Sequence, residues 1–317
     1  MIVSVKDILN EAKAGNYAVG AFNTVNLETT QAILRVASEL ESPVIVQVTE
    51  KTLEYAGGRA IFHLISDVAE SYYPQVPVGI HLDHGKSFEL IERAVEIGFN
   101  SVMYDGSRKK YVDNVATTKR VVEFCHKKGV SVQGELGNVP YIGEVATQTI
   151  VWEDYMTNPE EACRFVEETG IDTLAVAIGN AHGFFPERPE PDYDRLQTLS
   201  RCVRLPIVLH GASDWDGERV EKVIRLGVSC FNVDTAIRLS FLSQLSQTLA
   251  SGSETDLRSV LGTARESVEA AVRKKILLFG SNGKAANREG IPEHDEKERS
   301  RNNESIRSRE TTEMNYE

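Results

Sequence analysis

The stretch Thr173-Leu174-Ala175-Val176-Ala177-Ile178-Gly179-Asn180-Ala181-His182-Gly183 joins an apolar run to a short polar segment that holds a His-Gly pair. The run Thr173–Ile178 is apolar on both alternating faces, which is typical of a parallel strand covered by helices on each side. We therefore interpret it as a buried strand with His182 just beyond its carboxyl end.

Similar apolar runs recur along the chain and alternate with amphipathic stretches. Seven further candidate strands are Ala18–Phe22, Val44–Val48, Val76–Leu82, Ser101–Tyr104, Val130–Gly134, Pro206–Leu209 and Val228–Val233. Helix-like segments between them are Leu27–Leu40, Arg59–Ser71, Phe88–Ile97, Val112–Lys128, Pro159–Thr169, Tyr193–Cys202 and Glu218–Leu226, with helical sequence from Ala236 onward. This alternation predicts an α/β fold, a (β/α)₈ TIM barrel with additional C-terminal helices. An open doubly wound sheet is less favoured because no GxGxxG motif follows the first strand.

The composition changes near residue 286. The last 31 residues hold nine acidic and six basic side chains but few large apolar ones. Such a segment buries too little surface to offset the entropy of ordering. We expect residues 1–286 to form a single catalytic barrel domain and residues 287–317 to be a charged, disordered tail.

Charge and cysteine usage restrict the class of protein. A net charge of −12 argues against a nucleic-acid or anionic-membrane surface, because either would need a broad basic face. No apolar stretch suggests export or membrane insertion. No CxxC pair occurs, so neither a disulfide framework nor a cysteine zinc site is expected, and a reducing cytoplasm fits. The four scattered cysteines are Cys125, Cys163, Cys202 and Cys230.

Polar side chains gather where the predicted strands end. His84, His182 and His210 each precede a glycine just after an apolar run. In a parallel barrel the carboxyl ends of the strands meet at one mouth, so the three imidazoles are expected to converge. Three neutral nitrogen ligands with an open fourth position are typical of a catalytic Zn²⁺ site.

Other strand ends carry amides, carboxylates and glycine. Asp83 adjoins His84, where it would either transfer a proton at the metal or orient the metal ligand. The segments Gly211-Ala212-Ser213 and Asn232-Val233-Asp234-Thr235 follow the seventh and eighth strands, where barrels often bind phosphate through backbone N–H groups. The remaining polar strand ends are Asn23, Asp105 and Glu135.

These segments together resemble the class II, metal-dependent ketose-bisphosphate aldolases, which act on fructose 1,6-bisphosphate or tagatose 1,6-bisphosphate. The resemblance covers residues 1–286. The segments that carry it are Gly20-Ala21-Phe22-Asn23, Tyr55-Ala56-Gly57-Gly58, His81-Leu82-Asp83-His84-Gly85, Gly134-Glu135-Leu136-Gly137, Ala177–Gly183, Leu209–Ser213, Asn232–Arg238 and Leu278-Phe279-Gly280-Ser281.

The resemblance implies a role for each of these residues. It makes His84, His182 and His210 the zinc ligands, and Asp83 the acid/base at the substrate C4 hydroxyl. Asp105 and Glu135 match positions linked to an additional or alternative metal site, for a second divalent metal or a monovalent cation. The implied contacts of the phosphorylated ketose are Asn23, Gly183, Gly211, Ser213, Asn232, Asp234 and Thr235. The implied reaction is reversible aldol cleavage to dihydroxyacetone phosphate and glyceraldehyde 3-phosphate, by a homodimer or homotetramer.

One segment departs from the family pattern. A glycine-rich acidic loop is expected after Glu135-Leu136-Gly137, but the chain reads Asn138-Val139-Pro140-Tyr141-Ile142-Gly143-Glu144. Glu144 is the candidate for exchanging the dihydroxyacetone-phosphate proton, with a solvated loop glutamate as the alternative.

Several functions stay open at this point. They are an aldolase for another phosphosugar, a metal-dependent hydrolase and a noncatalytic phosphosugar-binding subunit. Lys51 and Lys86, near other strand ends, also leave an imine mechanism formally open.

Overall fold

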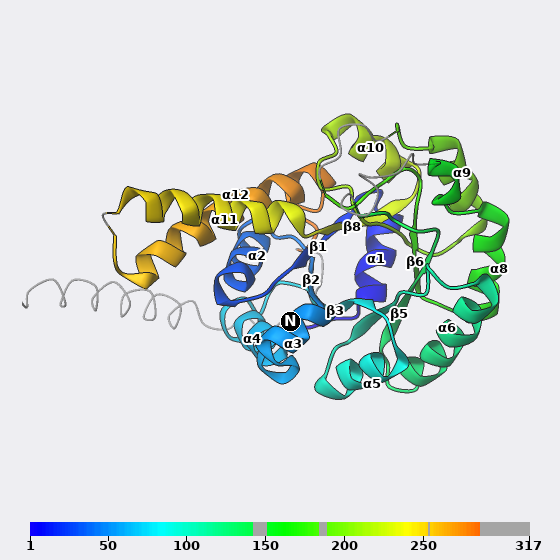
Figure 1. The fold of residues 1–317 in the computed structure, drawn as a ribbon, viewed down its shortest axis with the longest axis horizontal. Coiled ribbons are helices and arrows are strands. Elements are labelled where there is room, and N and C mark those ends of the chain that lie inside the picture. Colours follow the sequence, from blue (N-terminus) through cyan, green and yellow to red (C-terminus); the bar gives the residue numbers. More distant parts are fainter. Residues whose placement is uncertain (142–150, 184–188, 253, 286–317) are drawn as a thin grey trace, which may run out of the picture. The chain divides into compact units, whose positions relative to one another are not determined.

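The computed structural model describes residues 1–141, 151–183, 189–252 and 254–285, and its strands form a closed parallel barrel (Figure 1). Each strand pairs with the next along the chain, and the eighth pairs with the first. The strands are β1 (Val19–Asn23), β2 (Val44–Thr49), β3 (Val78–Gly85), β4 (Ser101–Tyr104), β5 (Ser131–Leu136), β6 (Thr173–Val176), β7 (Ile207–Leu209) and β8 (Val228–Val233). The predicted (β/α)₈ barrel is confirmed.

Helices cover the outside of the barrel (Figure 1). Those of the barrel itself are α2 (Leu27–Glu39), α3 (Glu50–Ala56), α4 (Gly58–Tyr72), α5 (Phe88–Ile97), α6 (Tyr111–His126), α8 (Pro159–Thr169), α9 (Tyr193–Cys202) and α10 (Gly217–Arg225), with a short 3₁₀ turn at Trp152–Asp154. Capping residues define where several of these helices begin. Asn26 and Thr29 form a reciprocal capping box at α2, and Asn158 caps α8, whose first residue is Pro159.

The hydrophobic core has two parts. The larger part lies between the strands and the surrounding helices. The smaller part fills the barrel and joins side chains such as Ile45, Met103 and Val208 to a helix that precedes the first strand, α1 (Val5–Ala14). Its residues Ile8 and Leu9 are fully buried against this inner cluster. The sequence analysis did not identify α1, which contacts β1, β3 and β8.

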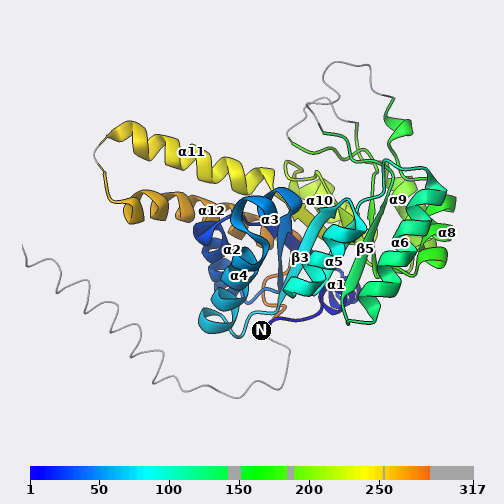
Figure 2. The same cartoon turned by 60° about the horizontal axis from the view of Figure 1, so that its bottom comes forward.

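Two long helices extend the fold beyond the barrel, as predicted. They are α11 (Thr235–Ser251) and α12 (Leu257–Phe279), which pack on each other as a hairpin, with α12 also packing on α2. Figure 2 shows the hairpin reaching away from the barrel. Among the described helices, none combines the length and the apolarity needed to cross a membrane.

Two expectations are corrected. Cys163 and Cys202 form a disulfide, because α8 packs against α9 and brings their Cα atoms to 5.7 Å. Strand β6 ends at Val176, two residues earlier than predicted. The next backbone N–H groups leave the sheet pairing, since that of Ala177 donates to Thr157 Oγ1 and that of Ile178 to Asn180 Oδ1.

The chain divides by its contacts into one unit of Met1–Ala286 and another of Asn287–Glu317. The second unit lies outside the described residues, and its disorder stays a prediction.

Candidate active site

The predicted site residues that the structure describes, all except Glu144, lie at the carboxyl mouth of the barrel. A cavity of about 240 Å³ opens there. Its walls come from the ends of four strands (β1, β2, β3 and β8), the loops that follow β5, β6 and β7, and the start of α11. The lining residues are Asn23, Thr49, Asp83, His84, Tyr141, His182, Gly183, His210, Gly211, Ser213, Asn232, Asp234, Thr235 and Arg238.

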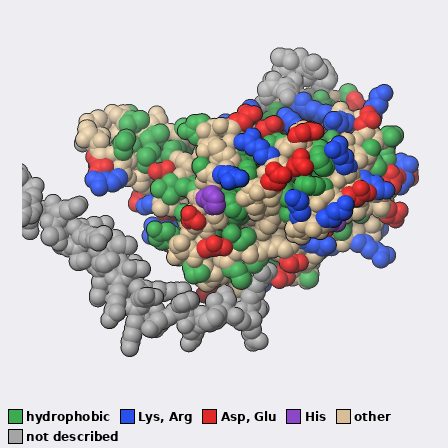
Figure 3. All heavy atoms as spheres, turned by 90° about the horizontal axis from the view of Figure 1, so that it is seen from below, with side chains coloured by type: hydrophobic (Ala, Val, Ile, Leu, Met, Phe, Trp, Pro, Cys, Tyr) green, Lys and Arg blue, Asp and Glu red, His purple; other side chains and the backbone are tan. Residues whose placement is uncertain are grey.

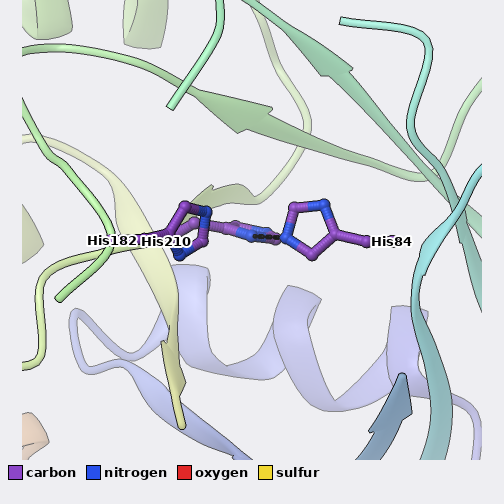
Figure 4. A group of neighbouring side chains, drawn as sticks. All are labelled: His84, His182 and His210. Carbon is purple, nitrogen blue, oxygen red and sulfur yellow. Dashed lines mark hydrogen bonds between the residues drawn. The ribbon is translucent and has the colours of Figure 1, made fainter. Parts of the chain in front are cut away.

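Three imidazoles form the centre of this cavity (Figure 4). One ring nitrogen from each of His84, His182 and His210 lies within 4.8 Å of the others. The closest pair is His84 Nε2 and His210 Nδ1, at 2.9 Å. His182 Nε2 is buried and has no hydrogen-bond partner among the described residues. Three ring nitrogens this close together are a donor set that fits a metal ion such as Zn²⁺.

Local backbone geometry directs the side chain of His84 into the cavity. The register between β3 and β4 shifts between Leu82 and Gly85, and His84 has a φ of 52°. A bulge of this kind redirects a side chain that would otherwise follow the regular alternation of the strand. The Nδ1 atom of His84 then lies 2.9 Å from Asp105 Oδ2, which leaves Nε2 facing the other two rings.

Burial and the neighbouring charges shift the pKa values of the three histidines in opposite directions. Burial alone would lower the pKa of His84, but the carboxylates of Asp83, Asp105 and Glu135 outweigh it and raise the pKa to about 9. Burial, with the charge of His84, lowers the pKa of His182 to about 4 and that of His210 well below its usual value. His182 and His210 are thus held as neutral imidazoles, the form that binds metals.

Two amides hold Asp83 in place. Asn23 Nδ2 donates to Asp83 Oδ2 at 3.0 Å, and Asn232 Nδ2 lies 3.2 Å from Asp83 Oδ1. Gln47 Nε2 in turn donates to Asn23 Oδ1 at 2.7 Å. These hydrogen bonds fix the position of the Asp83 side chain at the edge of the histidine cluster.

Asp105 and Glu135 lie on the far side of the His84 ring. One atom each from His84, Asp105 and Glu135 forms a second group that fits within 4.8 Å. Glu135 is buried, and burial together with the charge of Asp105 raises its pKa to about 8. Asp105 is already engaged, since its Oδ1 accepts from the hydroxyl of Ser107 at 2.7 Å. The same His84 nitrogen would have to serve both Asp105 and a second metal.

The glycine loop after β7 passes close to the loop after β6. Gly211 has a φ of 63°, and a Cβ placed there would lie 2.4 Å from the carbonyl carbon of Ala181. Only glycine allows this approach without a shift of the backbone. Behind the loop, Lys275 of α12 donates from Nζ to the Ser213 carbonyl at 2.7 Å.

The cavity contains groups that the sequence analysis had not placed in the site. Tyr141 and Arg238 line it, although both belong to segments noted for other reasons. Lys275 was missed because an interior helix position gives no signal that it reaches a distant loop. Glu144 lies outside the described residues.

A closed parallel barrel with three converging histidines and a carboxylate at its carboxyl mouth is the arrangement typical of metal-dependent TIM-barrel enzymes. The chain belongs to the class II fructose-bisphosphate aldolase family, whose model matches residues 3–284. It is therefore an aldolase, a carbon–carbon lyase, of a family that depends on a metal.

Known relatives support this assignment over most of the chain. The sequence is 43% identical over 310 residues to a fructose-bisphosphate aldolase of Thermus caldophilus, covering 90% of this chain and 100% of the relative. It is 40% identical over 288 residues to a fructose-bisphosphate aldolase of Geobacillus stearothermophilus, with 90% and 99% covered.

Among solved structures, the YdjI aldolase of Escherichia coli K12 superposes with a TM-score of 0.79 at 30% identity, covering 90% of this chain and 100% of the other. A putative fructose-1,6-bisphosphate aldolase from Coccidioides immitis superposes with a TM-score of 0.80 at 30% identity, with 89% and 98% covered.

Proposed function

We propose that this aldolase reversibly cleaves a ketose 1,6-bisphosphate to dihydroxyacetone phosphate and glyceraldehyde 3-phosphate, with Zn²⁺ held by His84, His182 and His210. The observation that carries the proposal is the convergence of three ring nitrogens within 4.8 Å beside Asp83. Fructose 1,6-bisphosphate is the first substrate to test, because the relatives are named for it. Tagatose 1,6-bisphosphate is the second.

The metal, when bound, supplies a Lewis acid for the carbonyl of the substrate. The protein's own part in the cleavage direction is to remove the proton of the C4 hydroxyl, which we assign to Asp83. Its two amide donors, from Asn23 and Asn232, hold the carboxylate beside the cluster. We keep Glu144 as the candidate for the proton exchange on the dihydroxyacetone-phosphate side.

The dihydroxyacetone-phosphate end is expected at the loops after β6, β7 and β8. Gly183, Gly211 and Ser213 offer backbone there, and Thr235 begins the 17-residue helix α11. Backbone N–H groups and the positive end of a helix favour a phosphate. This local arrangement binds an anion despite the net charge of −12.

A second and wider cavity supports a place for the other phosphate. It measures about 790 Å³ and shares Asn23, Thr49 and Asp83 with the first. Its walls include five cationic side chains, those of Lys51, Lys86, Arg108, Lys109 and Arg238. The same lining holds the carboxylates of Glu50, Asp83, Asp105 and Asp234, so the support for a second anionic group comes from the local excess of the lysines and arginines.

We further propose that Asp105 orients His84 in the loaded enzyme by accepting a hydrogen bond from its Nδ1 atom. The alternative is that Asp105 and Glu135 bind a second divalent metal or a monovalent cation. The short contact to His84 Nδ1 supports the first use. Counting the metal ions bound by each chain separates the two.

We propose a homodimer or homotetramer. Three leucines of α11, Leu239, Leu242 and Leu249, are about half exposed, and only Ile237 of that helix is buried. Figure 3 shows apolar side chains gathered on the hairpin. Light scattering of the purified protein tests the assembly, and a monomer at working concentration would contradict it.

The activity is tested with purified protein, stripped by a chelator and then reloaded with Zn²⁺, by measuring dihydroxyacetone phosphate from each bisphosphate. We expect cleavage only in the reloaded sample. A folded, zinc-loaded protein that cleaves neither sugar would favour another phosphosugar or a noncatalytic binding subunit. Release of inorganic phosphate without aldol cleavage would favour a hydrolase.

A further inference from the structure

Each histidine of the cluster needs something to fix the direction of its ring. The torsion between Cβ and an imidazole is broad, so a histidine's own rotamer preference leaves the ring free to turn. Metal-binding histidines are usually fixed by a hydrogen bond at the other ring nitrogen. His84 has such a partner in Asp105, and His210 lies 3.2 Å from the amide of Asn232.

His182 differs from the other two. Among the described residues, no side chain makes a hydrogen bond with its imidazole. Instead, the ring of Tyr141 stacks on it, with ring centroids 4.3 Å apart and the planes 14° from parallel. A ring held flat against another cannot turn about its torsion without losing that contact.

The backbone fixes this pair as well. Tyr141 and His182 form an isolated parallel bridge, and the N–H of His182 donates to the Pro140 carbonyl at 2.9 Å. The loop after β5 is therefore joined to the loop after β6 at the residue that bears the imidazole. Tyr141 also lines both cavities, and 46% of its surface stays exposed.

We propose that Tyr141 is a positioning residue, which fixes the plane of the His182 ring by stacking so that one ring nitrogen stays turned toward those of His84 and His210. This inference rests on the proposed zinc site. It assigns a use to Tyr141, which lies where the sequence departs from the glycine-rich loop expected after β5. Glycine at position 141 would have no side chain to stack on an imidazole.

The test is the affinity for Zn²⁺, measured by competition with a chromogenic chelator on the full chain. Tyr141→Phe keeps the ring and removes the hydroxyl, whereas Tyr141→Leu and Tyr141→Ala remove the stacking. We expect the Phe variant to bind within about 2-fold of wild type, and the Leu and Ala variants to bind about 10-fold more weakly. Tyr72→Ala is the matched control, because Tyr72 is 72% exposed at the end of α4.

Co²⁺ substitution gives a second readout that does not depend on the sugar. The visible absorption of bound Co²⁺ reports ligand geometry, so we expect it to change in the Leu and Ala variants and to stay unchanged in Tyr141→Phe. Saturating Zn²⁺ should restore most of kcat in all three variants. Circular dichroism and a thermal melt establish that each variant is folded.

The proposal is overturned if the folded Leu and Ala variants bind Zn²⁺ as wild type does and show its Co²⁺ spectrum. It is equally overturned if Tyr141→Phe behaves like Tyr141→Ala, because the hydroxyl would then be the active group. Wild-type protein that binds no metal would instead refute the proposed function, so the two failures are distinguishable.

Discussion

Replacing Asp105 by asparagine tests how the first ligand of the proposed metal site is held. The carboxylate lies 2.9 Å from His84 Nδ1 and makes a charge-assisted hydrogen bond. An asparagine oxygen still accepts from the same N–H group, so the variant keeps the geometry and loses the charge. Charged hydrogen bonds stabilise by about 1 to 2 kcal/mol more than neutral ones, which corresponds to about 10-fold in Zn²⁺ affinity.

The assay is chelator competition together with the number of Zn²⁺ ions bound per chain. We expect Asp105→Asn to bind one Zn²⁺ about 10-fold more weakly and Asp105→Ala to lose up to about 100-fold. The matched control is Ser107→Ala, which removes the hydroxyl that donates to Asp105 Oδ1, keeps the Ser107 N–H donor, and should change the affinity less than about 3-fold. The reasoning is refuted if wild type binds two ions and Asp105→Asn loses one of them while the other keeps its affinity.

Three further substitutions have defined outcomes. Lys275→Met removes the donor to the Ser213 carbonyl and should raise KM about 10-fold with little change in kcat. Burial lowers the pKa of Lys275 to about 8, so at this residue the unfolded chain binds more protons between pH 8 and 10.5. The free energy of unfolding of wild type, minus that of this variant, should therefore rise with pH, and urea titrations of both proteins at pH 7.5 and 10 measure the difference. Gly211→Ala brings a Cβ against the Ala181 backbone and should lower kcat/KM about 100-fold, and an unchanged value would show that the loop adapts. Asp83→Asn should lower kcat by about 10²- to 10⁴-fold with Zn²⁺ retained, and loss of the metal would instead make Asp83 a support for the ligands.

The barrel could be predicted because each strand and helix leaves its own pattern of apolar residues in a short stretch of sequence. Runs such as Val228–Val233 are apolar on both faces, and their repetition between amphipathic segments is enough to indicate the fold. The convergence of the three histidines followed from topology alone, since parallel strands place their carboxyl ends at one mouth. Helix α1 was missed because it precedes the first strand and so lies outside the strand–helix alternation.

Contacts between distant residues could not be predicted from the sequence. The stacking of Tyr141 on His182 depends on two loops that meet only in the fold, and Lys275 reaches Ser213 from 62 residues away. The Cys163–Cys202 disulfide has the same origin, because it depends on the packing of two helices and not on cysteine spacing. Sequence spacing reports neighbours along one element, whereas these partners belong to different ones.

The measurement that tests the central claim most directly is aldol cleavage of fructose 1,6-bisphosphate and tagatose 1,6-bisphosphate, side by side, by chelator-stripped and Zn²⁺-reloaded protein. We predict that dihydroxyacetone phosphate forms only after reloading and that His182→Ala abolishes both the activity and the binding of Zn²⁺. Equal cleavage by the stripped protein, with no metal bound, would contradict the account.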